Sequence, residues 1–314
     1  MSNKLKIYCV TNKVLKNLEN SSLKLVGVGK EKFSDKYLDC SEKINIYSKE
    51  KYYSELTFHY WYWKNLLQNE DAEWVGFCQK RRFWIKKNTD IDKVNSENLL
   101  ENLIFEPEND WKNYNTLLCN PINISGTTKM KLIKRGWRNI IKNPSLIFSK
   151  KKESIKLHFD MHHGYGNLDK AIEMLNDDDK LDFKKFVENN SEFNPHIMFI
   201  AKPKIIKLWF SALFPWLEKC EKLFGFENLK GYGLVRIYTF LAERFMPYWF
   251  RKNTKTTTMP IIFYDIRKDL DQKPLYFFLK SKKVFNFLSF SETIGFLVGQ
   301  LFFKDLSFQI IPFS

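Results

Sequence analysis

A short apolar segment that runs directly into a group of cations limits the folds available to this chain more than any other feature. Residues 74–78 are apolar and of strand length, and Lys80, Arg81 and Arg82 follow almost at once. A helix-length block rich in aromatic residues, 51–67, precedes this segment. A strand that ends in cations at the mouth of an α/β sheet is a typical position for an anionic ligand. The pattern therefore predicts an α/β domain with an anion-binding edge.

The composition is that of a folded globular protein in a reducing compartment. The chain has 314 residues, of which 44% are hydrophobic and 28% charged, so it can bury a full core in one large domain or in a domain with an appendage. Its formal net charge of +15 comes mostly from lysine and is weak evidence for any particular partner. The five cysteines show no C-x-x-C spacing, which argues against a disulfide framework or a zinc finger.

Short apolar runs alternate with longer helical stretches along the chain. Strands are predicted at residues 6–11, 74–78, 116–119, 197–201 and 259–264, and helices at 51–67, 129–142, 203–224 and 234–250. This alternation predicts a mostly parallel sheet covered on both faces. The first residues lack the apolar core of a signal peptide, and the apolar stretch 284–303 contains Glu292, which disfavours a transmembrane helix. We therefore expect a cytoplasmic protein.

The aromatic block and the cationic strand resemble two motifs of a bacterial family of capsular-polysaccharide glycosyltransferase-like proteins. In that family a Y-C-E-L-T-x-x-Y-W-x-W-K-N helix is followed by a V-G-L-x-H-Y-R-R-Y strand end. Residues 53–65 match the first motif with Ser54 in place of cysteine, and residues 75–83 match the second with Gln79 and Lys80 in place of histidine and tyrosine. Weaker matches at residues 7–13, 194–200 and 236–244 extend the resemblance over roughly residues 5–250.

The resemblance implies a GT-A-like (Rossmann-like) α/β fold, in which a mostly parallel sheet is flanked by helices and the C-terminal half carries helical additions. It implies a glycosyltransferase domain at residues 1–255 and leaves residues 256–314 as a C-terminal extension packed on that domain. The implied reaction transfers a hexose, in pyranose or furanose form, from a nucleotide sugar, with UDP as the expected nucleotide. The implied acceptor is a capsular or other surface polysaccharide, or a lipid-linked oligosaccharide.

Most of the site residues that the resemblance implies serve the donor. Lys80, Arg81 and Arg82 would hold the diphosphate in place of a metal bound to an Asp-x-Asp motif, because guanidinium groups bind phosphate oxygens bidentately. The alternative for this segment is an ordinary solvated basic turn. The other expected donor-binding residues are Thr11, Asn12, Lys13, Glu55, Thr57, Lys64, Asn65, Gln79, His162 and His163.

Three of the five histidines fall between residues 158 and 163. In an extended chain His158, Asp160 and His162 project to one face, whereas in a helix only the two histidines share a face. Either geometry could bind a metal, with Mn²⁺ or Mg²⁺ at these three residues, or could contact donor or acceptor. A polar loop is the alternative. We expect no metal requirement.

Glu243 is the expected catalytic base, because an inverting transferase needs a carboxylate to accept the proton of the acceptor hydroxyl. It lies in an apolar stretch, and burial would raise its pKa toward a useful range. Asp160 and Glu55 are the alternative bases. Arg244 is expected to point away from Glu243, because adjacent helix residues do not share a face. Arg244 and His196 are the expected acceptor-binding residues, and a purely structural pair of Glu243 with an arginine is the alternative.

Residues 129–152 carry nine cations and no acid, with apolar residues at helical spacing. This pattern is typical of a basic amphipathic helix on an anionic membrane surface, and equally of a core-packed helix with a solvated basic face. Two other classes of protein stay open. One is a basic nucleic-acid-binding protein, although the sequence contains no known motif for it. The other is a metal-dependent hydrolase or phosphotransferase built on residues 158–163.

Overall fold

The computed structural model describes residues 4–125, 129–142, 144 and 153–265, and the side chains from residue 134 onward in the second of these segments. The apolar stretch 284–303 and nearly all of the expected extension therefore lie outside the described residues. The first residues of the expected extension belong to the central sheet, because Thr256–Met259 and Ile261–Phe263 form two of its strands.

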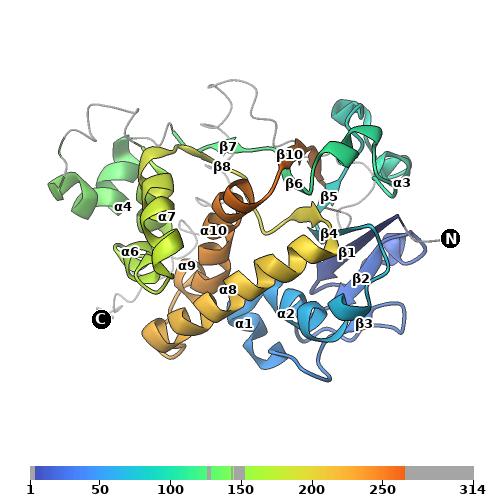
Figure 1. Ribbon diagram of the computed structural model, residues 1–314, viewed down its shortest axis with the longest axis horizontal. Helices are drawn as coiled ribbons and strands as arrows, with labels where there is room; N and C mark the ends of the chain where they lie inside the picture. The colour runs from blue at the N-terminus through green and yellow to red at the C-terminus, as the bar shows by residue number, and fades with distance from the viewer. Residues whose placement is uncertain (1–3, 126–128, 143, 145–152, 266–314) are drawn as a thin grey trace, which may run out of the picture. The chain divides into compact units, whose positions relative to one another are not determined.

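The central sheet of the described chain has nine strands, seven of them in the order β10-β6-β9-β4-β1-β2-β3 (Figure 1). Along this order all neighbouring strands are parallel except β9, which is antiparallel to β4 and β6. The predicted mostly parallel sheet is therefore confirmed. The strands are β1 (Leu5–Thr11), β2 (Lys24–Gly27), β3 (Leu38–Asp39), β4 (Trp74–Gln79), β5 (Arg82–Trp84), β6 (Thr116–Cys119), β9 (Phe199–Ala201), β10 (Thr256–Met259) and β11 (Ile261–Phe263).

Two short pairings complete the β-structure of the described residues. β5 turns back from the end of β4 and pairs with both β4 and β11. β7 (Ile122–Asn123) and β8 (Glu192–Phe193) form a separate two-stranded ribbon. The turn from β4 to β5 holds the cations of residues 80–82 at the sheet edge.

Side chains of the central strands alternate between two hydrophobic cores. Tyr8 and Val10 of β1 face a core built with helices α2 and α8, whereas Ile7 and Cys9 face a second core. Phe77 of β4 belongs to the first core, where it contacts the rings of Phe58 and Tyr62 on α2 and of Phe210 on α8. This period of two is what a strand buried on both faces requires.

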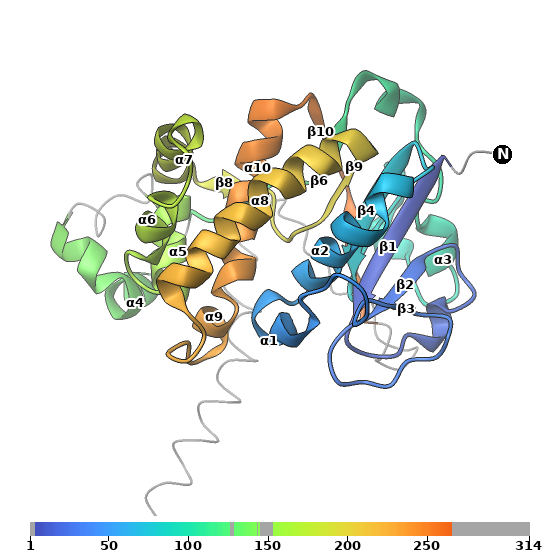
Figure 2. The same cartoon turned by 60° about the horizontal axis from the view of Figure 1, so that its bottom comes forward.

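The helices differ in what they pack against. α2 (Leu56–Asn65) and α8 (Pro203–Phe224) cover one face of the sheet, and α10 (Ile237–Asn253) packs on α8 (Figure 2). Figure 2 shows α5, α6 and α7 on the side of α10 away from β1, and Figure 1 shows α6 and α7 on the same side. The remaining α-helices are α1 (Glu50–Tyr53), α3 (Leu99–Asn102), α4 (Lys129–Lys142), α5 (Ile155–His163), α6 (Asn167–Ile172), α7 (Asp177–Asn189) and α9 (Tyr232–Val235).

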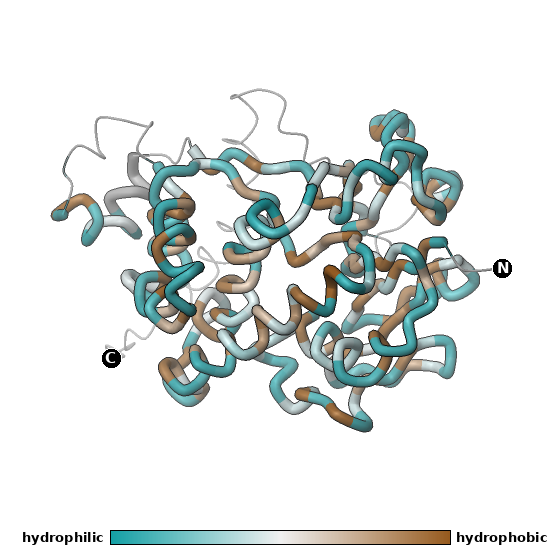
Figure 3. The backbone as a smooth tube through the Cα atoms, viewed as in Figure 1, coloured by the Kyte–Doolittle hydropathy of each residue, from teal (hydrophilic) through white to brown (hydrophobic). Residues whose placement is uncertain are grey.

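Surface and core follow the expected hydropathy pattern. Figure 3 shows hydrophobic residues along β4 and α8 and hydrophilic residues in most connecting segments. All five cysteines are buried free thiols, as their spacing predicted. Among the described residues, no helix combines the length and the apolar character that crossing a bilayer requires.

The continuous helix predicted at residues 51–67 is wrong, because the chain breaks at Ser54. Ser54 has φ +50°, which ends α1 one residue before Glu55, the N-cap residue of α2. Its carbonyl accepts a hydrogen bond from the hydroxyl of Thr57 (2.7 Å), and its hydroxyl accepts one from Arg236 (2.9 Å). A positive φ outside glycine is uncommon and costly, and the hydrogen bond from the distant Arg236 helps to hold the break in place.

Candidate functional site

A cavity of about 530 Å³ opens where the central parallel strands end. Asn12 follows β1, Val28 follows β2 and Lys80 follows β4, and each of these residues lines the cavity. This position agrees with the general rule that ligands of open α/β sheets bind beyond the carboxyl ends of the strands. The lining residues are Val10, Asn12, Val28, Glu50, Ser54, Glu55, Gln79, Lys80, Arg81, Arg82, His196, Ile197, Tyr232, Arg236, Thr239, Phe240 and Glu243.

One wall of the cavity is cationic. Lys80 donates a hydrogen bond to Asn12, and burial together with the charges of Arg81 and Arg236 lowers its pKa. Arg82 donates to the Gln79 side chain (3.2 Å), and its guanidinium lies 5.3 Å from the Phe263 ring. Arg81 pairs with Asp265 at the edge of this wall (3.2 Å). Crowded cations favour a ligand that brings several negative charges.

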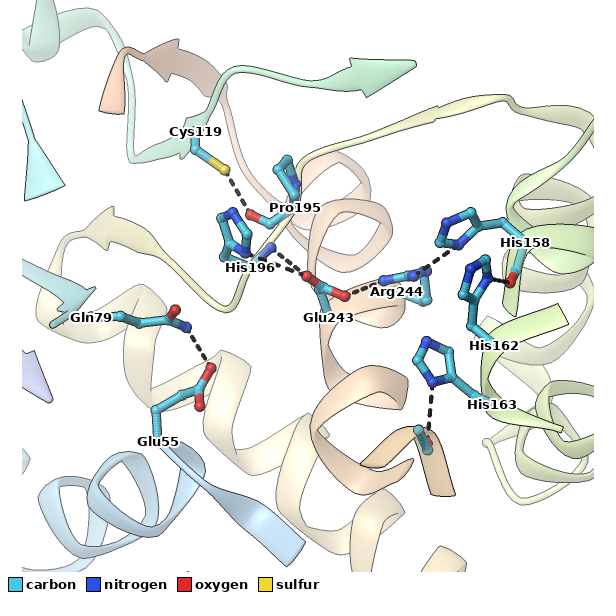
Figure 4. A network of polar contacts seen from close by, with 11 residues as sticks. Glu55, Gln79, Cys119, His158, His162, His163, Pro195, His196, Glu243 and Arg244 are labelled. Atoms are coloured by element: carbon cyan, nitrogen blue, oxygen red, sulfur yellow. Dashed lines mark hydrogen bonds and ion pairs between the residues drawn. The ribbon is translucent and has the colours of Figure 1, made fainter. Parts of the chain in front are cut away.

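Glu55 lies on the same wall and is held by Gln79. The Gln79 amide donates to the Glu55 carboxylate (Figure 4). The carbonyl oxygen of the same amide accepts from Arg82. Gln79 therefore spaces the carboxylate from the guanidinium. The break at Ser54 places Glu55, the N-cap residue of α2, beside the end of β4.

The opposite wall comes from α10 and carries Glu243. Its side chain is 14% exposed, and one oxygen accepts the backbone N–H of His196 (2.6 Å) while the other pairs with Arg244. Burial raises the pKa of Glu243, but the charge of Arg244 and the contacts with His196 outweigh it, so the net pKa is lowered. The expectation of a raised pKa is therefore wrong.

The prediction that Arg244 points away from Glu243 is wrong, because the two side chains form an ion pair. It is only 2% exposed, stacks 4.1 Å from the Phe193 ring and reaches His158 (3.3 Å) with its second guanidinium nitrogen. An arginine side chain is long enough to turn back to the residue before it in a helix. Arg244 lies behind Glu243, between it and the histidines of α5 (Figure 4), and is not among the cavity-lining residues.

His196 has a backbone conformation that sequence reasoning could not foresee. Its φ is +64°, which is rare for a residue with a side chain. Glu243 fixes this conformation through the His196 N–H, and Cys119 donates to the carbonyl of the preceding Pro195 (2.8 Å). The His196 ring consequently faces the cavity.

The cluster at residues 158–163 is helical, so the extended alternative is wrong. His158 and His162 stack with their rings 4.5 Å apart, whereas Asp160 turns away, accepts the Gly166 N–H (3.0 Å) and pairs with Lys156 (3.4 Å). The described residues contain no group of three or more His, Cys, Asp or Glu side chains with metal-binding geometry. The three residues named for Mn²⁺ or Mg²⁺ therefore do not converge, and Asp160 lies outside the cavity lining.

His163 contacts the cavity wall without lining it. Its ring stacks 3.9 Å from Phe240, a lining residue, and its Nδ1 lies 3.1 Å from the Gly233 carbonyl. His162 is exposed, with Nδ1 2.9 Å from the His158 carbonyl. The pair stands beside the cavity mouth.

Five of the expected donor-binding residues have structural partners outside the cavity. The Thr11 hydroxyl donates to the Lys13 carbonyl (2.6 Å), and Lys13 pairs with Glu31 (2.6 Å). Thr57 is buried against Ser54. At the far end of α2, Lys64 lies 3.5 Å from the Trp63 ring and Asn65 donates to the carbonyls of Ile44 and Trp61.

Arg236, Phe240 and Tyr232 are cavity residues that the sequence interpretation missed. A signal was present, because Arg236, Phe240 and Glu243 are spaced i, i+4 and i+7 and so share one helix face. The motif at residues 236–244 had drawn attention only to its last two residues. Thr239, at i+3 from Arg236, lies on the same helix face, whereas Glu50 gave no such signal.

The described side chains of α4 form a basic surface with exposed apolar residues. Trp137 is 51% and Ile141 69% exposed, beside Arg138 and Lys142, whereas Ile140 packs on α5. The helix is therefore partly core-packed and partly open to solvent. Its expected role at a membrane stays a prediction.

The buried histidines give a prediction for stability. Burial lowers the pKa of His59, His163 and His196 from 6.5 to about 3, aided for the last two by nearby arginines. Below pH 6.5 the unfolded chain binds protons that the folded chain resists, so the free energy of unfolding decreases as the pH falls toward 3. Each histidine contributes a loss of about 1.4 kcal/mol per pH unit.

We expect the melting temperature to fall steeply from about pH 6.5 to about pH 4, measured by circular dichroism. His59 is surrounded by the rings of Phe77, Phe199 and Phe210, so phenylalanine fits this site. His59→Phe should therefore reduce the number of protons that the chain binds on unfolding in this pH range by about one. A melting temperature that is constant over this range would contradict the burial of neutral histidines.

Comparison with known proteins identifies the fold and the family. A solved structure titled "WbbM bifunctional glycosytransferase apo structure" is similar, with a TM-score of 0.59 and 20% sequence identity. The match covers 83% of this chain and 45% of the other, so the chain corresponds to less than half of that protein. No curated protein matches the chain. The model of one family matches residues 6–254, and the chain therefore belongs to that family, described as "Domain of unknown function (DUF4422)".

Proposed function

We propose that this protein is a glycosyltransferase that moves a hexose from a nucleotide sugar, with UDP as the nucleotide, onto a capsular or other surface polysaccharide. One observation carries the proposal. Four cations, Lys80, Arg81, Arg82 and Arg236, and three carboxylates, Glu50, Glu55 and Glu243, line a cavity at the carboxyl ends of parallel strands. The similarity of the fold to part of a bifunctional glycosyltransferase supports the same reaction class.

The donor diphosphate would bind to the cationic wall. Arg82 and Arg236 offer guanidinium groups from two separate elements, so they can bind different phosphate oxygens bidentately. Lys80 adds a point charge, and burial strengthens each of these interactions by lowering the local dielectric. The nucleoside would extend toward Val10 and Val28, the apolar end of the lining.

These cations would stabilise the negative charge of the leaving diphosphate, the role that a divalent metal ion has in many other transferases. A divalent cation needs oxygen ligands, and the end of β4 offers Gln79, Lys80, Arg81 and Arg82 instead of paired carboxylates. Positive side chains at this position would repel a cation. The donor site is therefore suited to metal-independent binding.

Glu243 would accept the proton of the acceptor hydroxyl. Its lowered pKa keeps it ionised at neutral pH, and its two contacts fix the carboxylate while leaving lone pairs on the cavity side. A low pKa weakens a base, so orientation would have to supply much of its effect. Glu55 is the alternative, since it also lines the cavity, whereas Asp160 does not.

A lipid-linked acceptor would be met at a membrane surface. The exposed side of α4 combines Trp137 and Ile141 with four cations, Lys134, Arg135, Arg138 and Lys142. Such a surface matches anionic lipid head groups in charge and offers apolar side chains for the interface. This attachment would be peripheral.

The proposal predicts that UDP stabilises the protein without a metal. In the presence of EDTA, UDP at about 100 times its dissociation constant should add about 2.7 kcal/mol to the free energy of unfolding. That corresponds to roughly 4 °C in a thermal-shift assay of a chain of this length. Uridine, which lacks the diphosphate, is the matched control and should shift the melting temperature far less. Stabilisation that appears only with manganese would overturn the metal-independent site.

A further inference from the structure

Tyr232 is an exposed aromatic residue at the mouth of the cavity. It is 70% exposed and nevertheless belongs to the cavity lining. An aromatic side chain that is open to solvent at the edge of a polar cavity offers a flat apolar face to a ligand that enters the cavity. Because most of the Tyr232 side chain is exposed, its position must be fixed by the backbone around it and by neighbouring side chains.

The backbone around Tyr232 is held by neighbouring elements. Gly233 lies so close to α5 that a Cβ atom there would come within 2.1 Å of the His162 carbonyl oxygen. The Gly233 carbonyl lies 3.1 Å from His163 Nδ1, and Gly231 takes φ +75° directly before Tyr232. Two glycines and a histidine thus dock this turn on the C-terminal end of α5.

The Tyr232 ring is oriented by two further contacts. The Arg236 guanidinium lies 5.4 Å from the ring, and the Phe240 ring meets it edge-on at 5.8 Å. Tyr232, Arg236, Phe240 and Glu243 all line the cavity, at spacings that place them along one side of α9 and α10. This row leads from the exposed mouth to the buried carboxylate.

We propose that Tyr232 is the platform on which a sugar ring of the glycan acceptor stacks. The inference rests on the proposed function and adds the location of its acceptor subsite. Sugar rings present flat apolar faces that pack on aromatic rings. A sugar placed on Tyr232 would lie on the wall that carries Glu243, the group proposed to accept its hydroxyl proton.

The donor nucleoside is a less suitable occupant. The apolar end of the cavity near β1 and β2, at Val10 and Val28, already offers it a place, with polar groups from Asn12 and Glu50 beside it. Tyr232 comes from the opposite wall. Its exposure suits an acceptor that enters from solvent as part of a longer chain.

The test separates acceptor binding from donor binding. Saturation-transfer NMR would follow a set of methyl hexopyranosides and methyl hexofuranosides on the full chain saturated with UDP, and calorimetry would follow UDP and UDP-hexoses. The variants are Tyr232→Ala, Tyr232→Phe and, as a control, Leu208→Ala, which truncates a 58% exposed residue of α8 outside the cavity. The exposure of Tyr232 makes misfolding of the variants an unimportant risk.

We expect ring protons of at least one methyl hexoside to be saturated by the wild type, Tyr232→Phe and Leu208→Ala. In Tyr232→Ala that signal should fall about fivefold or more, because stacking contributes roughly 1 kcal/mol or more. The affinity for UDP and UDP-hexoses should stay within about twofold.

Three results would overturn the inference. They are the same methyl hexoside signal in Tyr232→Ala as in the wild type, no hexoside bound by the UDP-saturated wild type, or weaker binding of UDP or UDP-hexose in Tyr232→Ala. The last result would assign Tyr232 to the donor. Failure of the proposed function looks different, because the wild type would then bind no UDP at all.

Discussion

Replacing Arg81 and Arg82 together by alanine should abolish detectable binding of UDP while leaving the fold intact. Arg82 lines the cavity beside Gln79, and Arg81 stands at its edge with a side chain 35% exposed. Each charge-assisted hydrogen bond to phosphate contributes about 1.5–3 kcal/mol, so the loss of two should weaken binding roughly a hundredfold or more. Isothermal titration with UDP measures the effect directly.

The control for this variant must remove the same charge elsewhere. Lys204→Ala with Lys207→Ala removes two exposed cations from α8, which does not line the cavity. That double variant lowers the net charge equally and should bind UDP like the wild type. Equal losses in both double variants would mean that general electrostatic attraction, and not a diphosphate site, holds the nucleotide.

Single substitutions can show how much each of the two arginines contributes to the affinity for UDP. Arg81 already has Asp265 as a partner, so Arg81→Ala also leaves that carboxylate without its arginine at the cavity edge. Arg82 donates a hydrogen bond to the neutral Gln79 side chain, and the charges of Glu55 and Glu243 only partly offset the lowering of its pKa by burial. We expect Arg82→Ala to account for most of the lost affinity.

The regular part of the fold could be predicted from local pattern alone. The strand Thr116–Cys119 and the helices Lys129–Lys142 and Pro203–Phe224 have the predicted bounds, because apolar periodicity and a proline at the first helical turn are local signals. Strands β2 and β3 were missed. They have four and two residues, and their hydrogen bonds come from neighbouring strands that the local sequence does not reveal.

The site was predictable where it follows the end of a strand, and less so where tertiary contacts shape it. Residues 79–82 run from the last residue of β4 to the first residue of β5, and their sequence position alone brings them to the cavity. The break at Ser54 depends on Arg236, which is 182 residues away in the sequence. The turn at His196 depends likewise on Glu243. Such conformations are set by partners that a reading of local sequence does not identify.

The same limit explains the error about Glu243 and Arg244. Burial was correctly inferred from the apolar sequence, and burial alone does raise the pKa of a carboxyl group. The sign changes because Arg244 turns back onto Glu243 and because the His196 N–H also reaches it. To predict the direction of a pKa shift, the contacts of the group must therefore be known as well as its burial.

Glu243→Gln should lower the turnover of sugar transfer by roughly two to four orders of magnitude, the usual contribution of a positioned acid or base. Glutamine keeps the size of the side chain and one carbonyl oxygen to accept the His196 N–H, but it cannot take a proton at neutral pH. The affinity for UDP should change little, because the proposed phosphate contacts come from Lys80, Arg81, Arg82 and Arg236 and not from Glu243. Steady-state kinetics with UDP-hexose, together with titration of UDP, measures both quantities.

The same substitution should also destabilise the protein, because Arg244 is buried and would lose its counter-charge. Removing one partner of a buried ion pair costs about 3–5 kcal/mol. The lowered pKa of Glu243 means that this stabilisation is present above its ordinary pKa of 4.5 and is lost as the pH falls through the lower folded value. The difference in melting temperature between wild type and Glu243→Gln should therefore narrow in acid. Glu188→Gln, on the exposed side of α7, is the matched control and should change neither stability nor turnover.

Turnover must then be expressed per folded molecule, because a structural role and a catalytic role both reduce total activity. If Glu243 is only the partner of Arg244, the folded fraction of Glu243→Gln should transfer sugar at close to the wild-type rate. In that case Glu55, the other carboxylate of the cavity that was considered as a base, becomes the candidate, and Glu55→Gln should show the kinetic loss instead. Because the Glu55 carboxylate is held by the neutral Gln79 amide, Glu55→Gln should keep the wild-type melting temperature. A loss of turnover in Glu55→Gln without a loss of stability would therefore identify Glu55 as the base. A loss of stability in Glu243→Gln, together with a loss of turnover per folded molecule, would identify Glu243 as the base.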